Sequence, residues 1–295
     1  MRFTTYENNG RAGLAVADSA TRWKGLLEGH AAYPGALGDL IVTGNAALRK
    51  AAETLLHDGE PVDLAKVKTL QPFVAHGKII CVGLNYADHA AESSMTAPEF
   101  PVLFARFTSS LIAHNEPIVR PRVSERLDYE GELVAVIGMG GRHISKARAL
   151  DHIIGYSIFN DGSIRDYQLR TTQWTVGKNF DATGAFGPLF VTADELPPGA
   201  RGLKLVTRLN GQVMQSASTD DLIFDIATLV AGISEAMTLN PGDIIVTGTP
   251  SGVGGARKPP VWMKAGDVCE VEVERIGILR NPVDDEAALA APDKH

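Results

Sequence analysis

Residues 127–138 restrict the fold more than any other part of this sequence. The second half, 133–137, is an apolar run rich in β-branched side chains and predicts a buried strand. Glu130 and Glu132 stand at its start, and side chains two positions apart on a strand point to the same face. Two carboxylates beside an apolar core repel each other, so they need a shared proton, a basic partner or a metal cation. We interpret the pair as metal ligands.

The composition indicates a globular protein and excludes several function classes. Of 295 residues, 44% are hydrophobic and 21% are charged, and the formal net charge is −7. An acidic chain argues against binding to nucleic acid or to an anionic membrane. No apolar run approaches the roughly 20 residues that span a bilayer. The first residues have no apolar signal core, so we expect a cytoplasmic protein, with Cys81 and Cys269 reduced in the core.

Turn signals and periodicity divide the chain near residue 70. Residues 3–18 predict a hairpin with its turn at 8–10, and residues 21–27 and 45–57 predict helices. We predict a small N-terminal α/β domain over 1–70 and a larger domain over 71–295, whose last residues, 284–295, fray. Short strands in the larger domain do not alternate regularly with helices. This pattern predicts a β-rich α+β fold and argues against a doubly wound or barrel α/β fold.

A third carboxylate, Asp161, ends the apolar strand predicted over 153–159. Glu130, Glu132 and Asp161 are hard oxygen donors, which suit Mg²⁺, Mn²⁺ or Ca²⁺ better than zinc. Three protein carboxylates leave about half of an octahedral shell for water and substrate, as in a catalytic metal site. Two alternatives remain from spacing alone: a solvated strand start, and the carboxylate pair of a glycosidase, which the lack of an evident aromatic cluster disfavours.

Further polar residues suggest acid–base chemistry. His89 and Glu92 are three positions apart and meet on one face of a helical turn, where a carboxylate-held histidine acts as a general base. The alternative is an ordinary surface pair. Lys178, Arg165 and Gln168 are candidates for stabilising an anion that develops during reaction. Residues 93–101 are polar and proline-marked and predict a mobile loop that closes over the site.

Two glycine-rich segments do not support nucleotide binding. Residues 138–143 follow a strand but carry His143 where a dinucleotide fingerprint has its third glycine. Residues 248–255 lack the Lys-Ser/Thr ending of a phosphate-binding loop. The second segment is instead suited to presenting backbone N–H groups to a carboxylate.

Six motifs occur in order over about residues 78–282. They are Gly-Leu-Asn-Tyr-Ala-Asp-His at 83–89, Glu-Gly-Glu at 130–132, Asn-Asp at 160–161, Arg-Asp-Tyr-Gln at 165–168, Gly-Lys-Asn-Phe-Asp at 177–181, and Thr-Gly-Thr-Pro-Ser-Gly-Val-Gly at 247–254. Taken together, they resemble the fumarylacetoacetate hydrolase family. The resemblance implies a catalytic domain of rolled, mixed β-sheets and a homodimer.

The resemblance also implies roles for individual residues. Glu130, Glu132 and Asp161 match the ligands of a Mg²⁺ or Mn²⁺ ion, with Ca²⁺ as an alternative in crystals. His89 and Glu92 match the dyad that activates water, and Lys178 matches a lysine that faces the enolate. Arg165, Gln168 and Thr249 match residues near the substrate. The chain departs from the family at Ile164, often a small residue, and at Arg106, often a lysine, and we place Arg106 in the substrate pocket.

The predicted function is a metal-dependent hydrolase that cleaves a C–C bond in a small 2,4-dioxo acid of the acylpyruvate type. An isomerase or tautomerase, a hydratase and a 2-oxo acid decarboxylase are alternatives, because all of them need the same stabilised enolate. A metal-binding scaffold without activity is the alternative from another class. The expected partner is a small-molecule oxo acid, with no nucleic acid and no membrane.

Overall fold

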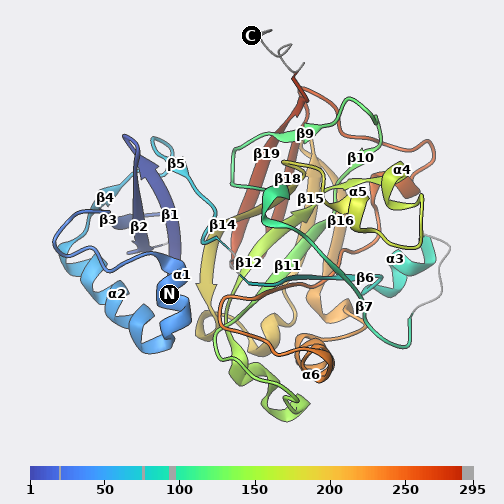
Figure 1. Cartoon of the computed structure of the whole chain (residues 1–295). Helices are drawn as coiled ribbons and strands as arrows, with labels where there is room; N and C mark the ends of the chain where they lie inside the picture. Colours follow the sequence, from blue (N-terminus) through green and yellow to red (C-terminus); the bar gives the residue numbers. More distant parts are fainter. Residues whose placement is uncertain (20, 75–76, 93–97, 288–295) are drawn as a thin grey trace, which may run out of the picture.

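The N-terminal part of the chain forms strands covered by two helices, and its first hairpin confirms the predicted turn (Figure 1). A computed structural model describes residues 1–19, 21–74, 77–92 and 98–287. Strands β1 (Arg2–Asn8) and β2 (Arg11–Ala17) join through Asn9 and Gly10, whose φ angles are 52° and 74°. Both values are positive, as a two-residue hairpin turn requires. The helices are α1 (Leu37–Thr43) and α2 (Asn45–Asp58).

The helix predicted over residues 21–27 is wrong. This segment forms strand β3 (Trp23–Leu27), which pairs antiparallel with β2 on one side and with β4 (Glu60–Val62) on the other. Gly25 lies where an added Cβ would stand 2.9 Å from the hydroxyl oxygen of Tyr6. The strand is therefore fixed by pairing with β2 and with the more distant β4, which outweighs local helical preference.

One mixed sheet of 12 strands runs through the molecule. Its main path is β4-β3-β2-β1-β14-β12-β11-β17-β6-β7, with β5 beside β1 and β8 beside β14. Because β1 pairs with β14, the N-terminal strands continue the same sheet as the rest of the chain. The remaining strands of this sheet are β5 (Lys68–Thr69), β6 (Ile79–Gly83), β7 (Val102–Ala105), β8 (Leu111–Ile112), β11 (Gly131–Ile137), β12 (Ile153–Asp161), β14 (Gly184–Thr192) and β17 (Ile244–Val246).

A second sheet packs against the first and encloses the larger core. Its order is β16-β15-β18-β19-β9, and its inward side chains, such as Val271 and Leu205, meet Leu133 and Ile158 of the large sheet. The members are β9 (Ile118–Arg120), β15 (Lys204–Leu209), β16 (Gln212–Ser218), β18 (Val268–Val273) and β19 (Gly277–Asp285). Helix α6 (Ile226–Ala236) adds Leu229 and Ile233 to this core. The α+β, strand-rich fold expected from the sequence is confirmed.

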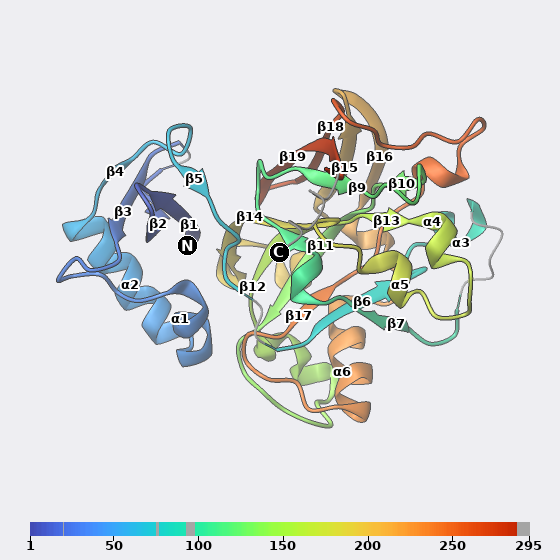
Figure 2. The same ribbon diagram turned by 45° about the horizontal axis from the view of Figure 1, so that its top comes forward.

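Three short helices gather on one side of the molecule in both views (Figures 1 and 2). They are α3 (Ala87–Glu92), α4 (Arg165–Gln168) and α5 (Thr175–Lys178). A two-stranded pair, β10 (Leu127–Asp128) and β13 (Ser163–Ile164), lies beside them. This side of the sheet therefore collects short segments that carry polar residues from distant parts of the sequence.

Other expectations can be compared with the described residues. Strand β19 extends to Asp285 and pairs with β9, so the start of the predicted frayed tail is ordered structure, while 288–295 lie outside the described residues. Most of the predicted closing segment, 93–97, also lies outside them. Cys81 and Cys269 are buried free thiols, as predicted. Within the described ranges, no helix combines the length and the apolar character needed to cross a membrane.

Candidate metal centre and active site

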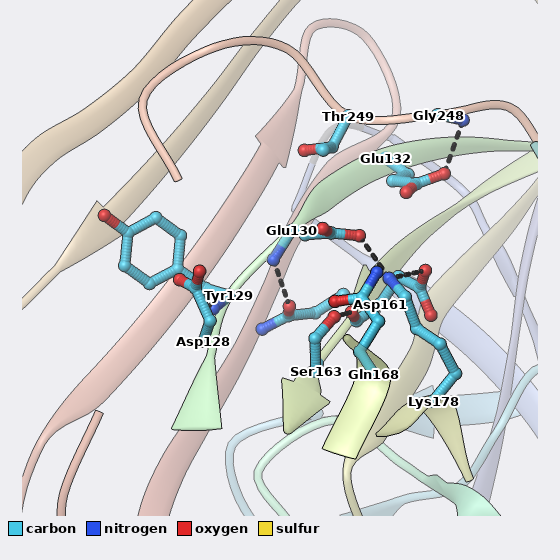
Figure 3. A network of polar contacts seen from close by, with 12 residues as sticks. Asp128, Tyr129, Glu130, Glu132, Asp161, Ser163, Gln168, Lys178, Gly248 and Thr249 are labelled. Carbon is cyan, nitrogen blue, oxygen red and sulfur yellow. Dashed lines mark hydrogen bonds and ion pairs between the residues drawn. The ribbon is translucent and has the colours of Figure 1, made fainter. Parts of the chain in front are cut away.

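Strand register brings the three predicted metal ligands together. Gly131 of β11 lies opposite Asn160 of β12, so Glu130 and Asp161 face each other across the two strands, and the Asp161 N–H donates to the Glu130 carbonyl at 2.8 Å. Glu132 follows two positions later on the same face. One carboxylate oxygen from each of Glu130, Glu132 and Asp161 lies within 4.8 Å of the other two, and all three residues are buried (Figure 3).

Two of these carboxylates have cationic partners. Lys178 Nζ lies 2.5 Å from Glu130 Oε2 and 2.6 Å from Asp161 Oδ2. Arg165 Nη1 lies 2.7 Å from Glu130 Oε1, and Arg106 Nη1 lies 2.6 Å from Asp161 Oδ1. Burial alone would lower the pKa of Lys178, but the carboxylates of Asp161 and Glu130 outweigh it and raise that pKa. The lysine is therefore a fixed positive charge inside the cluster.

Glu132 is the carboxylate that the described cations leave without a partner. Its Oε2 accepts one hydrogen bond, from the Gly248 N–H at 2.5 Å, and none of the ion pairs in the described part of the chain includes it. Burial first, and then the neighbouring carboxylates of Asp161 and Glu130, raise the pKa of Glu132 well above its ordinary value. A buried carboxylate in this situation gains strongly from a nearby cation.

The residues present fit a divalent metal ion. Three hard oxygen donors converge, and one of them is short of positive charge in the described structure. Both oxygens of Glu130 and of Asp161 already lie in ion pairs with basic side chains, so these two carboxylates would hold a metal ion together with Lys178, Arg165 and Arg106. The donor set contains carboxylates alone, so it suits Mg²⁺ or Mn²⁺ better than zinc.

The predicted His–Glu pair is formed. His89 and Glu92 lie on α3, and His89 Nδ1 is 2.9 Å from Glu92 Oε1. The Gly252 N–H donates to both oxygens of Glu92, at 3.0 and 2.9 Å. Burial opposes ionisation of Glu92, but the hydrogen bonds from His89 and Gly252 outweigh it and lower its pKa. With Nδ1 held by a carboxylate, Nε2 is the ring nitrogen left for proton transfer.

A cavity of about 720 Å³ connects these groups. Nearly all of the predicted site residues line it: His89, Glu92, Glu130, Glu132, Arg165, Gln168, Lys178 and Thr249. Gln168 Oε1 accepts from Arg165 Nη1 at 2.9 Å, and Thr249 Oγ1 donates to the Gly131 carbonyl at 3.0 Å. Apolar side chains, including Phe104 and Trp174, form another part of the wall, and their rings meet edge to face at 5.6 Å.

The structure does not place Arg106 in the substrate pocket, where the sequence interpretation put it. In the described structure, its side chain lies behind Asp161 with no exposed surface. It also donates to the Gly162 carbonyl, Thr183 Oγ1 and Ser110 Oγ, so its donors are used by the protein itself. Ile164 is likewise fully buried and does not belong to the described cavity wall. The two departures from the family pattern therefore bear on packing beneath the site.

Arg106→Met is expected to destabilise the protein by roughly 3–5 kcal/mol, because it leaves Asp161 as a buried carboxylate that has lost one of its partners. Arg106→Lys should recover most of that loss, since an ammonium group still pairs with Asp161. Urea unfolding measures both effects. Arg148→Met is the matched control, because the Arg148–Asp151 pair is exposed and such pairs contribute at most about 1 kcal/mol. Equal losses in the Arg106→Met and Arg148→Met variants would contradict this role.

Two buried polar residues of the site escaped the sequence interpretation. Gln215 of β16 donates to Thr249 Oγ1 and to the Pro250 carbonyl, both at 2.8 Å, and accepts from the Gly131 N–H at 3.0 Å. No local pattern could have identified it. Asp128 stands two positions before Glu130, so the same alternation that linked Glu130 and Glu132 was the signal that pointed to it.

Fold and site together define an enzyme whose buried carboxylates, basic residues and histidine line one cavity. Residues 78–284 match the fumarylacetoacetate hydrolase C-terminal domain. The chain belongs to the fumarylacetoacetate hydrolase family, which confirms the resemblance predicted from the motifs.

Relatives in the family have different activities. The chain is 38% identical over 252 residues to a mitochondrial oxaloacetate tautomerase of Xenopus laevis, covering 85% of this chain and 79% of the relative. A fumarylacetoacetate hydrolase structure from Exiguobacterium antarcticum has a TM-score of 0.85 and 37% identity, covering 97% of this chain and all of that one. A maleylpyruvate hydrolase from Sphingobium, in complex with manganese(II) and pyruvate, has a TM-score of 0.80 and 28% identity over the same shares.

Proposed function

We propose that this protein catalyses the keto–enol tautomerisation of oxaloacetate or a similar small 2-oxo diacid, with a divalent metal. The observation that carries the proposal is that Glu130 and Glu132 line the same cavity as the His89–Glu92 pair, with Asp161 completing the carboxylate cluster beside them. Such a site can stabilise an enolate and move a proton beside it. The identity to proteins named oxaloacetate tautomerases supports this substrate.

In the proposed mechanism the protein side chains bind the substrate and move one proton. A Mg²⁺ or Mn²⁺ ion held by Glu130, Glu132 and Asp161 would supply positive charge that stabilises the enolate oxygen. His89, oriented by Glu92, takes a proton from the carbon next to the keto group and returns it to the oxygen, or the reverse. Arg165 offers Nη2, which has no hydrogen-bond partner in the described structure, to a substrate carboxylate.

The C–C hydrolysis predicted from the sequence is the second candidate. The His89–Glu92 pair favours it specifically, because a carboxylate-held histidine can also deprotonate water for attack on a carbonyl. Hydrolysis would add one water to an acylpyruvate and release pyruvate and a carboxylic acid. The shared fold with a maleylpyruvate hydrolase supports keeping this reaction in the test.

The deciding experiment follows enol absorbance and identifies products. The purified protein, with Mg²⁺ or Mn²⁺, is assayed against oxaloacetate and a panel of acylpyruvates. We expect faster equilibration of oxaloacetate without formation of pyruvate. Pyruvate with a carboxylic acid from an acylpyruvate would select hydrolysis, and pyruvate with CO₂ from oxaloacetate would select decarboxylation. No rate above the metal-only background with any substrate would favour the non-catalytic scaffold.

His89→Gln is expected to lower turnover by roughly 10²–10⁴-fold, the usual contribution of a positioned general base. Binding of Mn²⁺ should stay unchanged, because the three carboxylates are intact. His57→Gln is the matched control: His57 Nδ1 lies 2.6 Å from Asp58, but its side chain is 86% exposed, against 8% for His89. Steady-state rates and Mn²⁺ titration provide the measurements. Decarboxylation needs no activated water, so a decarboxylase would keep its rate in the His89→Gln variant.

The homodimer and the cytoplasmic location predicted from the sequence stay predictions. Light scattering of the purified protein tests the first, and cell fractionation tests the second. The Xenopus relative is named as mitochondrial, so membership of the family does not by itself fix the compartment.

A further inference from the structure

Asp128 is a fully buried carboxylate, outside the predicted metal cluster, that accepts four hydrogen bonds. Its Oδ1 accepts from the N–H groups of Tyr129 at 2.9 Å and Gly254 at 2.8 Å. Its Oδ2 accepts from the Gly255 N–H at 2.9 Å and from Arg165 Nε at 2.8 Å. Figure 3 shows it beside Tyr129, on the segment that leads to Glu130. The carboxylate thus joins a cavity arginine to the glycine-rich loop at 248–255.

The bond to Asp128 sets the direction of the Arg165 guanidinium group. Nε is held by Asp128, while Nη1 is held by Glu130 at 2.7 Å and Gln168 at 2.9 Å. A guanidinium group is planar, so fixing two of its nitrogens fixes the third. The third, Nη2, is buried and has no hydrogen-bond partner in the described part of the chain, so a substrate group that reaches it would complete its hydrogen bonding. Asp128 therefore determines where Arg165 presents its unused donor.

The same carboxylate holds the glycine-rich loop that reaches the His–Glu pair. At Gly254 a Cβ would overlap the Val261 carbonyl and stand 2.7 Å from Asp128 Oδ1, so the close approach requires glycine. Two residues earlier in this loop, Gly252 donates its N–H to Glu92. The hydroxyl of Tyr129, the residue after Asp128, donates to the Gly252 carbonyl at 3.0 Å. Displacement of Asp128 would therefore move both the arginine and the support of the general base.

We propose that Asp128 is a positioning residue of this active site. It aims Arg165 Nη2 at a carboxylate of the substrate and holds the loop that orients Glu92. The inference rests on the proposed function in one respect, namely that the ligand of Arg165 is an oxo acid carboxylate.

The test is Asp128→Asn, which keeps the shape of the side chain. The amide has one acceptor oxygen and one NH₂ group, so in either orientation two of the four N–H donors face another donor. We expect kcat/KM for oxaloacetate to fall roughly a hundredfold, mainly through KM, as for a binding group misplaced by about 1 Å. Binding of oxalate to the Mn²⁺-loaded protein should weaken in parallel. Binding of Mn²⁺ alone should not change.

Asp243→Asn is the matched control. Asp243 is equally buried, accepts from the backbone N–H groups of Lys78 at 2.7 Å and Asn240 at 2.8 Å, and pairs with Lys78 Nζ, but it lies away from the cavity wall. This variant should lose stability without a change in KM or oxalate affinity. In the metal-free protein, hydrogen exchange at 250–257 should accelerate in Asp128→Asn and not in Asp243→Asn.

A double-mutant cycle separates positioning from simple stabilisation. In an Arg165→Gln background, Asp128→Asn should cost little further in oxalate affinity, because the group that it positions is already gone. An undiminished cost in that background, or oxalate affinity equal to the wild type in Asp128→Asn, would overturn the proposal. If Asp128→Asn does not fold, Gly255→Ala carries the test, since the added Cβ stands 3.2 Å from Asp128 Oδ2. The same weakening of oxalate binding is then expected, and wild-type affinity would refute the proposal.

The oxalate readout also keeps this inference apart from the proposed function. A wild-type protein that binds oxalate but does not tautomerise oxaloacetate would contradict the function and leave the role of Asp128 standing. A wild-type protein that turns over oxaloacetate, with normal oxalate binding in Asp128→Asn, would contradict the role of Asp128 alone.

Discussion

Glu132→Gln is expected to abolish divalent-metal binding and to make the metal-free protein more stable. Glutamine keeps the shape and can still accept the Gly248 N–H, but it removes the buried charge that lacks a cationic partner in the described structure. Turnover should fall by roughly a thousandfold or more, since a metal Lewis acid contributes several kcal/mol to the transition state. The melting temperature of the metal-free variant should rise by about 2–4 °C for each 1 kcal/mol gained.

The balance of buried charges explains why Glu132→Gln should lose metal binding and yet stabilise the metal-free protein. Four carboxylates are buried here, Glu130, Glu132, Asp161 and Asp128, against three cations, Arg106, Arg165 and Lys178, so ionisation of all four leaves one negative charge in excess. A metal ion would neutralise that excess, and the neutral amide introduced by Glu132→Gln removes it. Without metal, the uncompensated charge lowers the stability of the folded state. Binding of a metal ion to the folded state therefore raises its stability.

The same charge imbalance makes the folding stability of the metal-free protein depend on pH. Because the folded-state pKa of Glu132 is raised above its ordinary value of 4.5, the folded state keeps a proton that the unfolded state releases. The stability that goes with this proton on Glu132 is fully present below pH 4.5 and is lost as the pH rises through the folded-state pKa. Glu132→Gln should remove this part of the pH dependence, and thermal unfolding across roughly pH 4–8 checks it.

Asp243→Asn again serves as the comparison, because Asp243 is a buried carboxylate that already has Lys78 as its partner at 2.7 Å. Its removal should lower the melting temperature and leave metal content unchanged. Full Mn²⁺ occupancy in Glu132→Gln, measured by elemental analysis after dialysis, would refute the ligand assignment. A lowered melting temperature of its metal-free form would refute the charge argument.

The sequence was sufficient to predict the parts of the site that depend on strand periodicity. Glu130 and Glu132 share a face because of the two-residue repeat, and Asp161 joins them because two apolar strands end in acidic residues. The hairpin turn at Asn9-Gly10 was predictable for a similar reason, since its positive φ angles have strong residue preferences. These features are encoded within a few neighbouring residues.

Features that depend on long-range pairing could not be predicted. The segment 21–27 became a strand because β2 and β4 flank it, and its own sequence does not contain that information. Arg106 was assigned to the pocket by motif position, but it lies behind Asp161, which is 55 residues away in sequence. The join between β1 and β14 also spans most of the chain. Such contacts are set by register and packing of whole sheets.

Lys178→Met is expected to make the metal-free protein less stable, the opposite of the effect expected for Glu132→Gln. Lys178 Nζ contacts both Glu130 and Asp161, and its removal leaves two buried carboxylates with less compensation. Loss of one partner from a buried ion pair typically costs about 3–5 kcal/mol. Turnover should also fall by roughly 10²–10³-fold, the scale for a lost group that stabilises developing negative charge.

Metal addition should then stabilise Lys178→Met more than it stabilises the wild type. Lys178 and a metal ion draw on the same two carboxylates, so removing the lysine increases the negative charge that the ion can neutralise. The measurement is the rise in melting temperature with increasing Mn²⁺. Lys78→Met is the matched control, because Lys78 pairs with buried Asp243 away from the cavity and should leave the Mn²⁺ effect unchanged. An Mn²⁺-dependent rise no larger in Lys178→Met than in Lys78→Met would show that lysine and metal do not share these ligands.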